Sequence, residues 1–390
     1  MSYETIKIND ICTKVTSGGT PKSTNAEFYN PKEVPWLKTG EVNYCRIYDT
    51  ETYISKEGLA RSSAKLIPKN SVIIAMYGQG DTAGRVAINK IPLSTNQACC
   101  NLIINHEIAD YEYVYYALST LYDKLVSLKN GGAQPNLNAG IIKAVEIPFP
   151  ELVTQKKIAS ILSNYDYLIE NNHKQIKLLE EAAQRLYKEW FVDLRFPGYE
   201  NCKIVDGIPE KWERKKLVDI VDVQYGYAFD GSKFNSVGRG TPIIRIRNIP
   251  DGNTADFTTE EAEEKYVISN GEILVGMDGE FHINSWSGKD AFLVQRTCCF
   301  RPRKREMKGW LLWAIYEPIK FYEKTVVGAT VSHLGKKHID SIELLTGPEQ
   351  LYIPFQNYFE LRQKLLNQNI VLAEARDRLL PKLMSGEIEV

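Results

Sequence analysis

The chain has 390 residues, of which 43% are hydrophobic and 11% aromatic, and its formal net charge is −1. This length exceeds what one hydrophobic core usually fills, and the aromatic content excludes a disordered chain, so two or more folded domains are expected. The near-neutral charge excludes nucleic-acid binding through overall basicity, so any such binding has to come from local patches.

The first residues, MSYETIKIND, lack the basic and apolar regions of a signal peptide, and no apolar run approaches the roughly 18 residues of a membrane span. The seven cysteines include two adjacent pairs, Cys99–Cys100 and Cys298–Cys299, which suit a disulfide framework poorly and indicate reduced, buried thiols. We therefore expect a cytoplasmic protein that contacts no membrane.

The chain contains an internal repeat, because two halves of about two hundred residues carry the same motifs in the same order. KINDI from Lys7 matches KLVDI from Lys216, VPWLKTGEVN from Val34 matches TPIIRIRNIP from Thr241, and KNSVIIAMYGQG from Lys69 matches NGEILVGMDGEF from Asn270. These matches place Met76 opposite Met277, Lys38 opposite Arg245, and Cys99–Cys100 opposite Cys298–Cys299. The segments are short, rich in Val, Ile, Tyr and Phe, and separated by Gly, Pro, Asn and Asp, which predicts a mostly β domain at the start of each half.

A long helix is expected at the end of each half. From about Thr154 to Trp190 there is no Gly or Pro, and apolar residues follow alternating steps of three and four, with Asn172 as the polar member. The second stretch starts near Phe355 and shows similar steps through Leu361 and Leu365, with Gln368 as its polar interruption. Because each narrow stripe needs a partner, we expect the two helices of one chain to pair as an antiparallel coiled coil.

The expected fold is therefore α+β, with two β-rich domains separated by two long helices. The division by sequence is 1–150 for the first β-rich domain, 151–195 for the first helix, 196–348 for the second β-rich domain, and 349–390 for the second helix. A helix of this length spans on the order of 55 Å, more than the ~34 Å turn of B-DNA. Such a pair favours binding to two half-sites on one duplex, although long helical stripes taken alone more often serve oligomerisation or scaffolding.

This combination resembles the specificity subunits of type I restriction-modification enzymes over nearly the whole chain. The stretch IPFPELVTQKKIASILSNYDYLIENN from Ile147 resembles the family's first helical region. STNQACCNLII from Ser94 and GGAQPNLNAGII from Gly131 resemble pieces of its target recognition domains, and LLPKLMSGEIEV is similar to its usual ending. The second junction, LLTGPEQLYIPFQNYFELRQ, departs from the pattern because it lacks the proline-rich strand end and the Gln-Lys-Lys sequence of the first.

The resemblance implies two target recognition domains, each of which reads one part of a split sequence in double-stranded DNA. It also implies docking of methyltransferase subunits on the helical regions, two of them if each quasi-equivalent face binds one, and a restriction subunit that translocates DNA. S-adenosylmethionine would be bound by the partner methyltransferase, and no cofactor by this chain.

No motif for chemistry is present in the chain itself. An adenine methyltransferase needs an Asn/Asp-Pro-Pro-aromatic loop and a glycine-rich cofactor loop, and the cluster GQGDTAG misses the G-x-G-x-x-G spacing. Cys-x-x-Cys, His-Glu-x-x-His and G-x-S-x-G are also absent. We therefore expect no catalytic residue, no metal ligand, and a chain that is not an enzyme.

Candidate DNA-contacting residues lie in the β-rich domains, because base edges are recognised by Arg, Lys, Asn, Gln, Glu and Asp. Arg245 and Arg247 alternate with isoleucines, which predicts that both project from one face of a strand, and Lys38 is the first-domain counterpart of Arg245. The other candidates follow the glycine turns or precede the long helices: Gln79, Asp81, Arg85, Gln134, Asn136, Asn138, Asn248, Glu280, His282, Asn284, His333 and Lys336. The alternative for each is that a polar loop is merely solvated, or that an Asn shapes a turn.

The aromatic cluster at the end of the first helix, Tyr187, Trp190 and Phe191, is a candidate anchor for a protein partner. Packing of these rings on the adjacent β-rich domain is an equally good interpretation. The competing function is a coiled-coil adaptor whose two β domains bind proteins, which the near-neutral charge supports. Salt-dependent binding to one defined duplex would exclude it.

Overall fold

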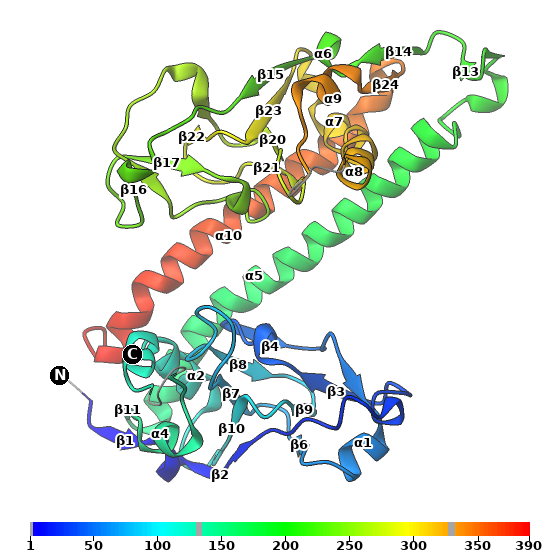
Figure 1. The fold of residues 1–390 in the computed structure, drawn as a ribbon. Coiled ribbons are helices and arrows are strands. Elements are labelled where there is room, and N and C mark those ends of the chain that lie inside the picture. The colour runs from blue at the N-terminus through cyan, green and yellow to red at the C-terminus, as the bar shows by residue number, and fades with distance from the viewer. Residues whose placement is uncertain (1–2, 130–134, 327–331) are drawn as a thin grey trace. The chain divides into compact units, whose positions relative to one another are not determined.

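The computed structural model describes residues 3–129, 135–326 and 332–390, and Figure 1 shows its fold. The chain divides into two compact units, here called unit 1 (residues 1–167 and 374–390) and unit 2 (residues 168–373). Each unit therefore contains one β-rich part together with a portion of both long helices. Within the described residues, no helix has the length and apolar character needed to cross a membrane.

Unit 1 starts with the elements of the first half of the sequence. Its strands are β1 (Thr5–Lys7), β2 (Cys12–Ser17), β3 (Val34–Leu37), β4 (Cys45–Ile47), β5 (Tyr53–Ile54), β6 (Leu66–Ile67), β7 (Val72–Ala75), β8 (Val86–Asn89), β9 (Leu93–Thr95), β10 (Cys99–Ile104) and β11 (Glu146–Pro148). Its short helices are η1 (Ile8–Ile11), η2 (Ala26–Phe28), η3 (Thr39–Glu41), α1 (Lys56–Ala60), α2 (Tyr111–Ser119), α3 (Tyr122–Ser127) and α4 (Ala139–Ala144).

The strands of unit 1 form a five-stranded sheet in the order β2-β10-β7-β8-β4, a four-stranded sheet in the order β5-β3-β9-β6, and the pair β1-β11. Alternate side chains of β7 point to opposite faces, so Val72 and Ile74 pack with α2 while Ile73 and Ala75 enter a second core beneath the four-stranded sheet. Both faces of β7 are therefore buried, which explains its uninterrupted apolar sequence.

Unit 2 repeats these elements. Its strands are β12 (Ile204–Val205), β13 (Ile208–Pro209), β14 (Glu213–Lys216), β15 (Val221–Tyr225), β16 (Phe234–Asn235), β17 (Thr241–Ile244), β18 (Phe257–Thr258), β19 (Val267–Ile268), β20 (Ile273–Gly276), β21 (Ile283–Ser285), β22 (Ala291–Leu293), β23 (Thr297–Pro302) and β24 (Glu343–Thr346). Its short helices are η5 (Tyr199–Asn201), α6 (Leu217–Ile220), η6 (Gly231–Lys233), η7 (Ile246–Asn248), η8 (Glu264–Tyr266), η9 (Arg305–Met307), α7 (Lys308–Ala314), α8 (Tyr316–Thr325), α9 (Lys336–Ser341) and η10 (Glu349–Tyr352).

The sheets confirm the predicted internal repeat. The order β15-β23-β20-β21 in unit 2 corresponds to β2-β10-β7-β8 in unit 1, and β14-β24 corresponds to β1-β11. The parallel pair β3-β9 has its counterpart in the parallel pair β17-β22. The two halves therefore share topology as well as sequence motifs.

The strand register corrects one detail of the predicted repeat. The amide of Met76 donates to the carbonyl of Ala98 and the amide of Met277 donates to the carbonyl of Arg296, so these residues are equivalent across the halves. Cys100 is therefore the counterpart of Cys298, and the two cysteine pairs are offset by one residue instead of matching directly. All four of these thiols are buried, as predicted.

The two long helices are α5 (Leu152–Tyr187), which continues as the π-helical turn η4 (Lys188–Val192), and α10 (Ile353–Ser385). In unit 2, Asn172 Nδ2 of α5 lies 2.8 Å from Asn369 Oδ1 and 3.3 Å from Gln368 Oε1 of α10. Residue numbers rise along α5 as they fall along α10, because Asp166 meets Arg376 in unit 1 and Glu180 meets Arg362 in unit 2. The predicted antiparallel pairing, with Asn172 in its polar layer, is confirmed, but the buried polar partner from α10 is Asn369, and the predicted Gln368 is exposed.

The predicted apolar stripe of the second helix is wrong at Leu361. Leu361 is 46% exposed, whereas the neighbouring Arg362 and Gln363 are buried. These two polar side chains face β21, where Ser285 Oγ lies 2.7 Å from Arg362 Nη1 and donates to Gln363 Oε1 at 2.7 Å. This face of α10 thus meets polar groups of the sheet instead of an apolar partner.

Candidate nucleic-acid interface

In unit 2, several of the predicted DNA-contacting residues line one cavity of about 540 Å³. The cavity brings together the region of η7, the segment between β20 and β21, and the turn between β22 and β23. Its lining contains three arginines and no carboxylate: Phe229, Gly231, Phe234, Arg245, Ile246, Arg247, His282, Val294, Gln295 and Arg296. A surface of this kind offers hydrogen-bond donors to an electronegative ligand.

Arg245 does not project from a strand as predicted. Strand β17 ends at Ile244, and Arg245 is the residue before η7, where its backbone amide donates to Asn248 Oδ1 at 2.8 Å. This side-chain hydrogen bond turns the chain, so Arg245 and Arg247 do not alternate along one strand face. The Arg245 guanidinium lies 5.7 Å from the centre of the Phe234 ring, a cation–π arrangement.

Arg247 and Asn248 are engaged within the protein. Arg247 Nη2 lies 2.6 Å from Asp256 Oδ1, and Asn248 Nδ2 lies 3.3 Å from Asp256 Oδ2. Burial of Asp256 would raise the pKa of its carboxyl, but the hydrogen bonds from Arg247 and Asn248 outweigh that effect and hold the pKa below its usual value. The carboxylate thus stays charged and fixes the loop that presents Arg245.

The predicted residues after β20 differ in their exposure to solvent. Glu280 is exposed and His282 half-buried, with His282 Nδ1 3.5 Å from Glu280 Oε1. Asn284 was expected on an exposed loop, and this prediction is wrong: it lies in β21 and is 8% exposed. Its amide donates to the carbonyl oxygens of Ile249 and Pro250, and its Oδ1 accepts from Arg362, so its polar atoms are engaged within the protein.

The cluster before α9 meets this same region. His333 and Asp278 form an isolated antiparallel bridge, and His333 Nδ1 lies 2.5 Å from Asp278 Oδ1. Arg296 Nε lies 3.4 Å from the other oxygen of Asp278. Lys336 is exposed at the first position of α9.

Two residues that line the cavity, Gln295 and Arg296, were not predicted from the sequence. The segment QRTC from Gln295 is nevertheless the register-matched counterpart of QACC from Gln97.

In unit 1, Lys38 has the position that the repeat predicted for it. It precedes η3 as Arg245 precedes η7, and its amide donates to Glu41 Oε1 at 3.0 Å. Its side chain is exposed, with Nζ 5.8 Å from the centre of the Trp36 ring. The two basic residues therefore occupy equivalent sites, each beside an aromatic ring.

The turn between β7 and β8 places Gln79 and Asp81 in solvent, while Arg85 is half-buried. Arg85 Nη2 lies 2.6 Å from Asp81 Oδ1, and this hydrogen bond lowers the pKa of the Asp81 carboxyl. Arg85 Nη1 donates to Asn43 Oδ1 at 3.0 Å. Of the three candidates, Gln79 has the side chain with the fewest internal contacts among those found in the described residues.

The amide cluster before α4 is only partly described. Gln134 lies outside the described residues. Asn138 Oδ1 accepts a hydrogen bond from the backbone amide of Ile141 at 3.0 Å and so caps α4, the turn-shaping role that was the alternative for this residue. Asn136 is half-buried beside Leu137, whose amide donates to Met76 O just as the amide of Leu334 donates to Met277 O in unit 2.

The aromatic residues at the end of α5 and in η4 pack mainly within unit 2, of which they are part. Phe191 is 5% exposed in the main core, and its ring stacks on that of Tyr187 with centroids 5.4 Å apart. Trp190 contacts Phe355 edge-on, with centroids 6.0 Å apart. Burial raises the pKa of Tyr187 to about 12. Packing on the adjacent domain, the alternative interpretation, accounts for Phe191.

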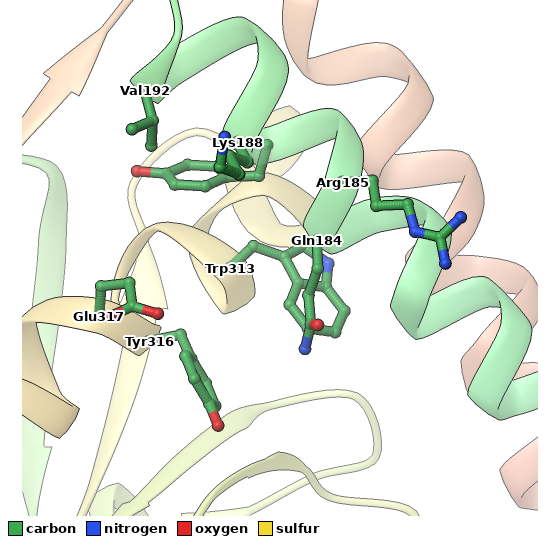
Figure 2. A pocket seen from close by; sticks show the side chains of 8 residues that line it. Gln184, Arg185, Lys188, Val192, Trp313, Tyr316 and Glu317 are labelled. Carbon is green, nitrogen blue, oxygen red and sulfur yellow. The ribbon is translucent and has the colours of Figure 1, made fainter.

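A second cavity of unit 2, of about 550 Å³, lies beside these aromatic residues. Figure 2 shows Gln184 of α5 beside Trp313 of α7, with Lys188 on η4 and with Tyr316 and Glu317 on α8. Arg185 also lines the cavity, and its guanidinium points away from these side chains. Tyr187 and the exposed Val192 complete its lining. Of the predicted partner-binding residues, Tyr187 lines this cavity, and Trp190 is likewise only half-buried.

Among the described residues, no group of three or more His, Cys, Asp or Glu side chains is arranged to hold a metal ion. The charged clusters described above are ion pairs between basic and acidic side chains. That the chain has no metal site and no catalytic residue stays a prediction from the sequence.

Comparison with known proteins decides the family. The sequence model of the type I restriction modification DNA specificity domain matches residues 2–181 and 209–348. The chain belongs to the family of type I restriction-modification specificity subunits. It is 30% identical over 411 residues to the type I restriction enzyme MjaIX specificity subunit of Methanocaldococcus jannaschii, covering 100% of this chain and 94% of that subunit.

Two further similarities agree with this assignment. The type I restriction enzyme EcoR124I/EcoR124II specificity subunit of Escherichia coli is 28% identical over 182 residues, or 46% of this chain and 45% of that subunit. The crystal structure of the type I restriction-modification S subunit from M. genitalium matches with a TM-score of 0.59 at 18% identity, covering 98% of this chain and 96% of that one, and so supports the fold. The family is one of DNA recognition, and the adaptor function finds no support in these comparisons.

Proposed function

We propose that this specificity subunit reads a split DNA target, with one half recognised by the β-rich part of unit 1 and the other by the β-rich part of unit 2. It directs methyltransferase and restriction subunits to that target and carries out no chemistry itself. Two methyltransferase subunits bind per chain, and S-adenosylmethionine is bound by those partners.

The observation that carries this proposal is the repetition of one candidate DNA surface in each unit. Lys38 and Arg245 occupy equivalent positions before η3 and η7, each beside an aromatic ring. Basic and amide side chains at such positions can pair with base edges in the major groove. Two similar surfaces with different side chains are suited to two different half-sites, which a single recognition site would not require.

The lining of the unit 2 cavity also supports DNA as the ligand. Three arginines and a histidine occur there without a carboxylate in the lining, although the whole chain carries a formal charge of −1. Arg247 and Arg296 are paired with Asp256 and Asp278, which lie outside the lining, so the cavity presents basic hydrogen-bond donors without a carboxylate facing it. Such a lining suits a near-neutral protein that binds a polyanion through a local surface.

The test is to co-express the chain with its cognate methyltransferase subunit in a host that lacks DNA methylation, and to map N6-methyladenine across the genome by single-molecule sequencing. We expect a split motif with a fixed unspecified spacer. The methyltransferase alone and this chain alone serve as controls, and neither is expected to give the motif.

A complex that co-purifies but yields no motif would contradict the proposal. The native mass of the complex measures the number of methyltransferase subunits, and a value other than two per chain would refute that part alone. Calorimetric titration of S-adenosylmethionine into the isolated chain and into the complex is expected to give heat only with the complex.

A further inference from the structure

Arg296 occupies an unusual place beside the cavity of unit 2. It lies in the turn between β22 and β23 with a φ of 69°, in the left-handed region that residues with a side chain adopt only at a cost of about 1–3 kcal/mol. Its side chain is 57% exposed, whereas the register-matched residue of unit 1, Ala98, is buried. Arg296 is therefore exposed in the turn before β23, where the other half has a buried alanine.

The guanidinium of Arg296 is held from one side. Its Nε lies 3.4 Å from Asp278 Oδ2, and Asp278 Oδ1 accepts a hydrogen bond from His333 Nδ1 at 2.5 Å. Backbone hydrogen bonds flank this pair, from Gly279 to Ser332 at 3.0 Å and from Leu334 to Met277 at 2.7 Å. Asp278 is thus fixed by its neighbours and orients Arg296, while the imidazole fixes the carboxylate.

This arrangement leaves the outer edge of the guanidinium available. Asp278 engages Nε. His333 Nδ1 lies 3.4 Å from Arg296 Nη1 and 2.5 Å from Asp278 Oδ1, and because an ionised carboxylate only accepts hydrogen bonds, the tautomer that satisfies Asp278 has its proton on this nitrogen. Apart from this imidazole nitrogen, the two terminal nitrogens have no hydrogen-bond acceptor among the residues that the structure describes. A planar pair of donors at a fixed orientation matches a ligand with two adjacent acceptors.

We propose that Arg296 is a specificity-determining residue that recognises a guanine in the half-site bound by unit 2, with Asp278 and His333 as its positioning residues. The inference rests on the proposed function and names one base of the target. Guanine presents O6 and N7 as neighbouring acceptors in the major groove, and a bidentate arginine is their commonest partner. Cytosine and adenine present an amino donor there, which an arginine cannot accept.

The experiment compares methylation maps of the co-expressed complex for the natural chain, Arg296→Ala, Arg296→Lys, Asp278→Asn and Arg239→Ala. Arg239 is an exposed arginine of unit 2 that does not line the cavity, so its substitution removes the same charge. We expect Arg296→Ala to lower discrimination at one guanine of one half-motif by roughly tenfold or more. The other half-motif and the spacer stay unchanged.

The remaining variants separate a base contact from other roles. Arg296→Lys is expected to lose the same discrimination because lysine lacks the planar fork, and Asp278→Asn to lose part of it. Arg239→Ala is expected to keep the natural motif. Folding of each variant is checked by thermal unfolding and by co-purification with the methyltransferase, and Arg296→Lys retains charge and length if Arg296→Ala fails to fold.

Two results would overturn the inference. A natural motif from folded Arg296→Ala means that Arg296 reads no base, and a uniform loss of methylation at all sites with the motif preserved means that it contacts phosphate. A natural chain that gives no split motif would instead refute the proposed function, so the two failures are distinguishable.

Discussion

Glycine is required at two equivalent residues of the repeat because a side chain there would overlap the backbone. A Cβ on Gly18 would lie 2.2 Å from the carbonyl oxygen of Asn96, and a Cβ on Gly226 would lie 2.0 Å from that of Val294. Gly18 directly follows β2 and approaches the turn between β9 and β10. Gly226 directly follows β15 and approaches the equivalent turn between β22 and β23. The close approach therefore belongs to the fold of each half and is independent of what each half recognises.

Substitution of Gly226 by alanine is expected to destabilise unit 2. Since the obstacle is backbone, the strands must separate, and overpacking of this kind costs about 1–3 kcal/mol or more. The free energy of unfolding in urea measures the loss. Gly231→Ala is the control, because a Cβ there meets nothing within 4 Å. Equal stability of the two variants would show that the turn adjusts freely.

For single residues, the sequence predicted which positions are equivalent in the two halves better than it predicted where each side chain points. The repeat correctly paired Lys38 with Arg245 because motif spacing is conserved between the halves. Asn284 was misplaced because the sequence around a glycine turn does not show hydrogen-bond partners from distant segments. Here those partners are Arg362 and two backbone carbonyl oxygens, and they hold Asn284 in the interior. Arg296 was missed for the same reason, since its partners lie 18 and 37 residues away in sequence.

At the scale of elements, a buried ionic network joins the long helices to the sheet of unit 1. Asp166 of α5 lies 3.1 Å from Arg46 of β4 and 2.5 Å from Arg376 of α10, and the Tyr116 hydroxyl also donates to it. The side chains of Arg46 and Asp166 are only 2% and 9% exposed. The Asp166 carboxylate thus connects α5 to β4, α10 and α2. Loss of its charge would deprive Arg46 and Arg376 of their shared partner.

We expect Asp166→Ala to cost about 3–5 kcal/mol of stability, because Arg46 and Arg376 lose their shared buried carboxylate and keep Glu112, 3.6 Å from Arg46, and the exposed Asp377 as carboxylate partners. Glu181→Ala is the matched control on the same helix. Its pair with Arg185 spans 3.6 Å at the surface, and such pairs contribute at most about 1 kcal/mol. Urea unfolding of both variants tests the difference, and similar losses would show that the network contributes no more than a surface pair.

The sequence predicted the helices themselves better than the network between them. Absence of Gly and Pro from Thr154 to Trp190 located α5, which runs from Leu152 to Tyr187. Periodicity could not show that Arg362 would be buried and Leu361 exposed, because it assumes that the buried face of a helix is apolar. A polar sheet edge as partner reverses that assumption over one turn.

For the whole molecule, the repeat implies that recognition is divided. Each unit contains its own sheets, its own cores and its own basic residue before a short 3₁₀ helix. The candidate DNA-contacting residues of one unit have no part in the sheets of the other. Sequence comparison of the halves was sufficient to predict this organisation, because strand order and turn positions follow from local motifs.

Lys38→Ala and Arg245→Ala are therefore expected to alter different halves of the methylated motif. Each substitution removes a basic side chain from one unit, and loss of a base contact typically costs about 1–3 kcal/mol, or roughly tenfold in discrimination at one base pair. Single-molecule methylation maps of the two variants, and of the double variant, measure this directly. The double variant should combine both changes, since effects at distant, independent sites add. A single substitution that changes both halves of the motif would show that the units do not read DNA independently.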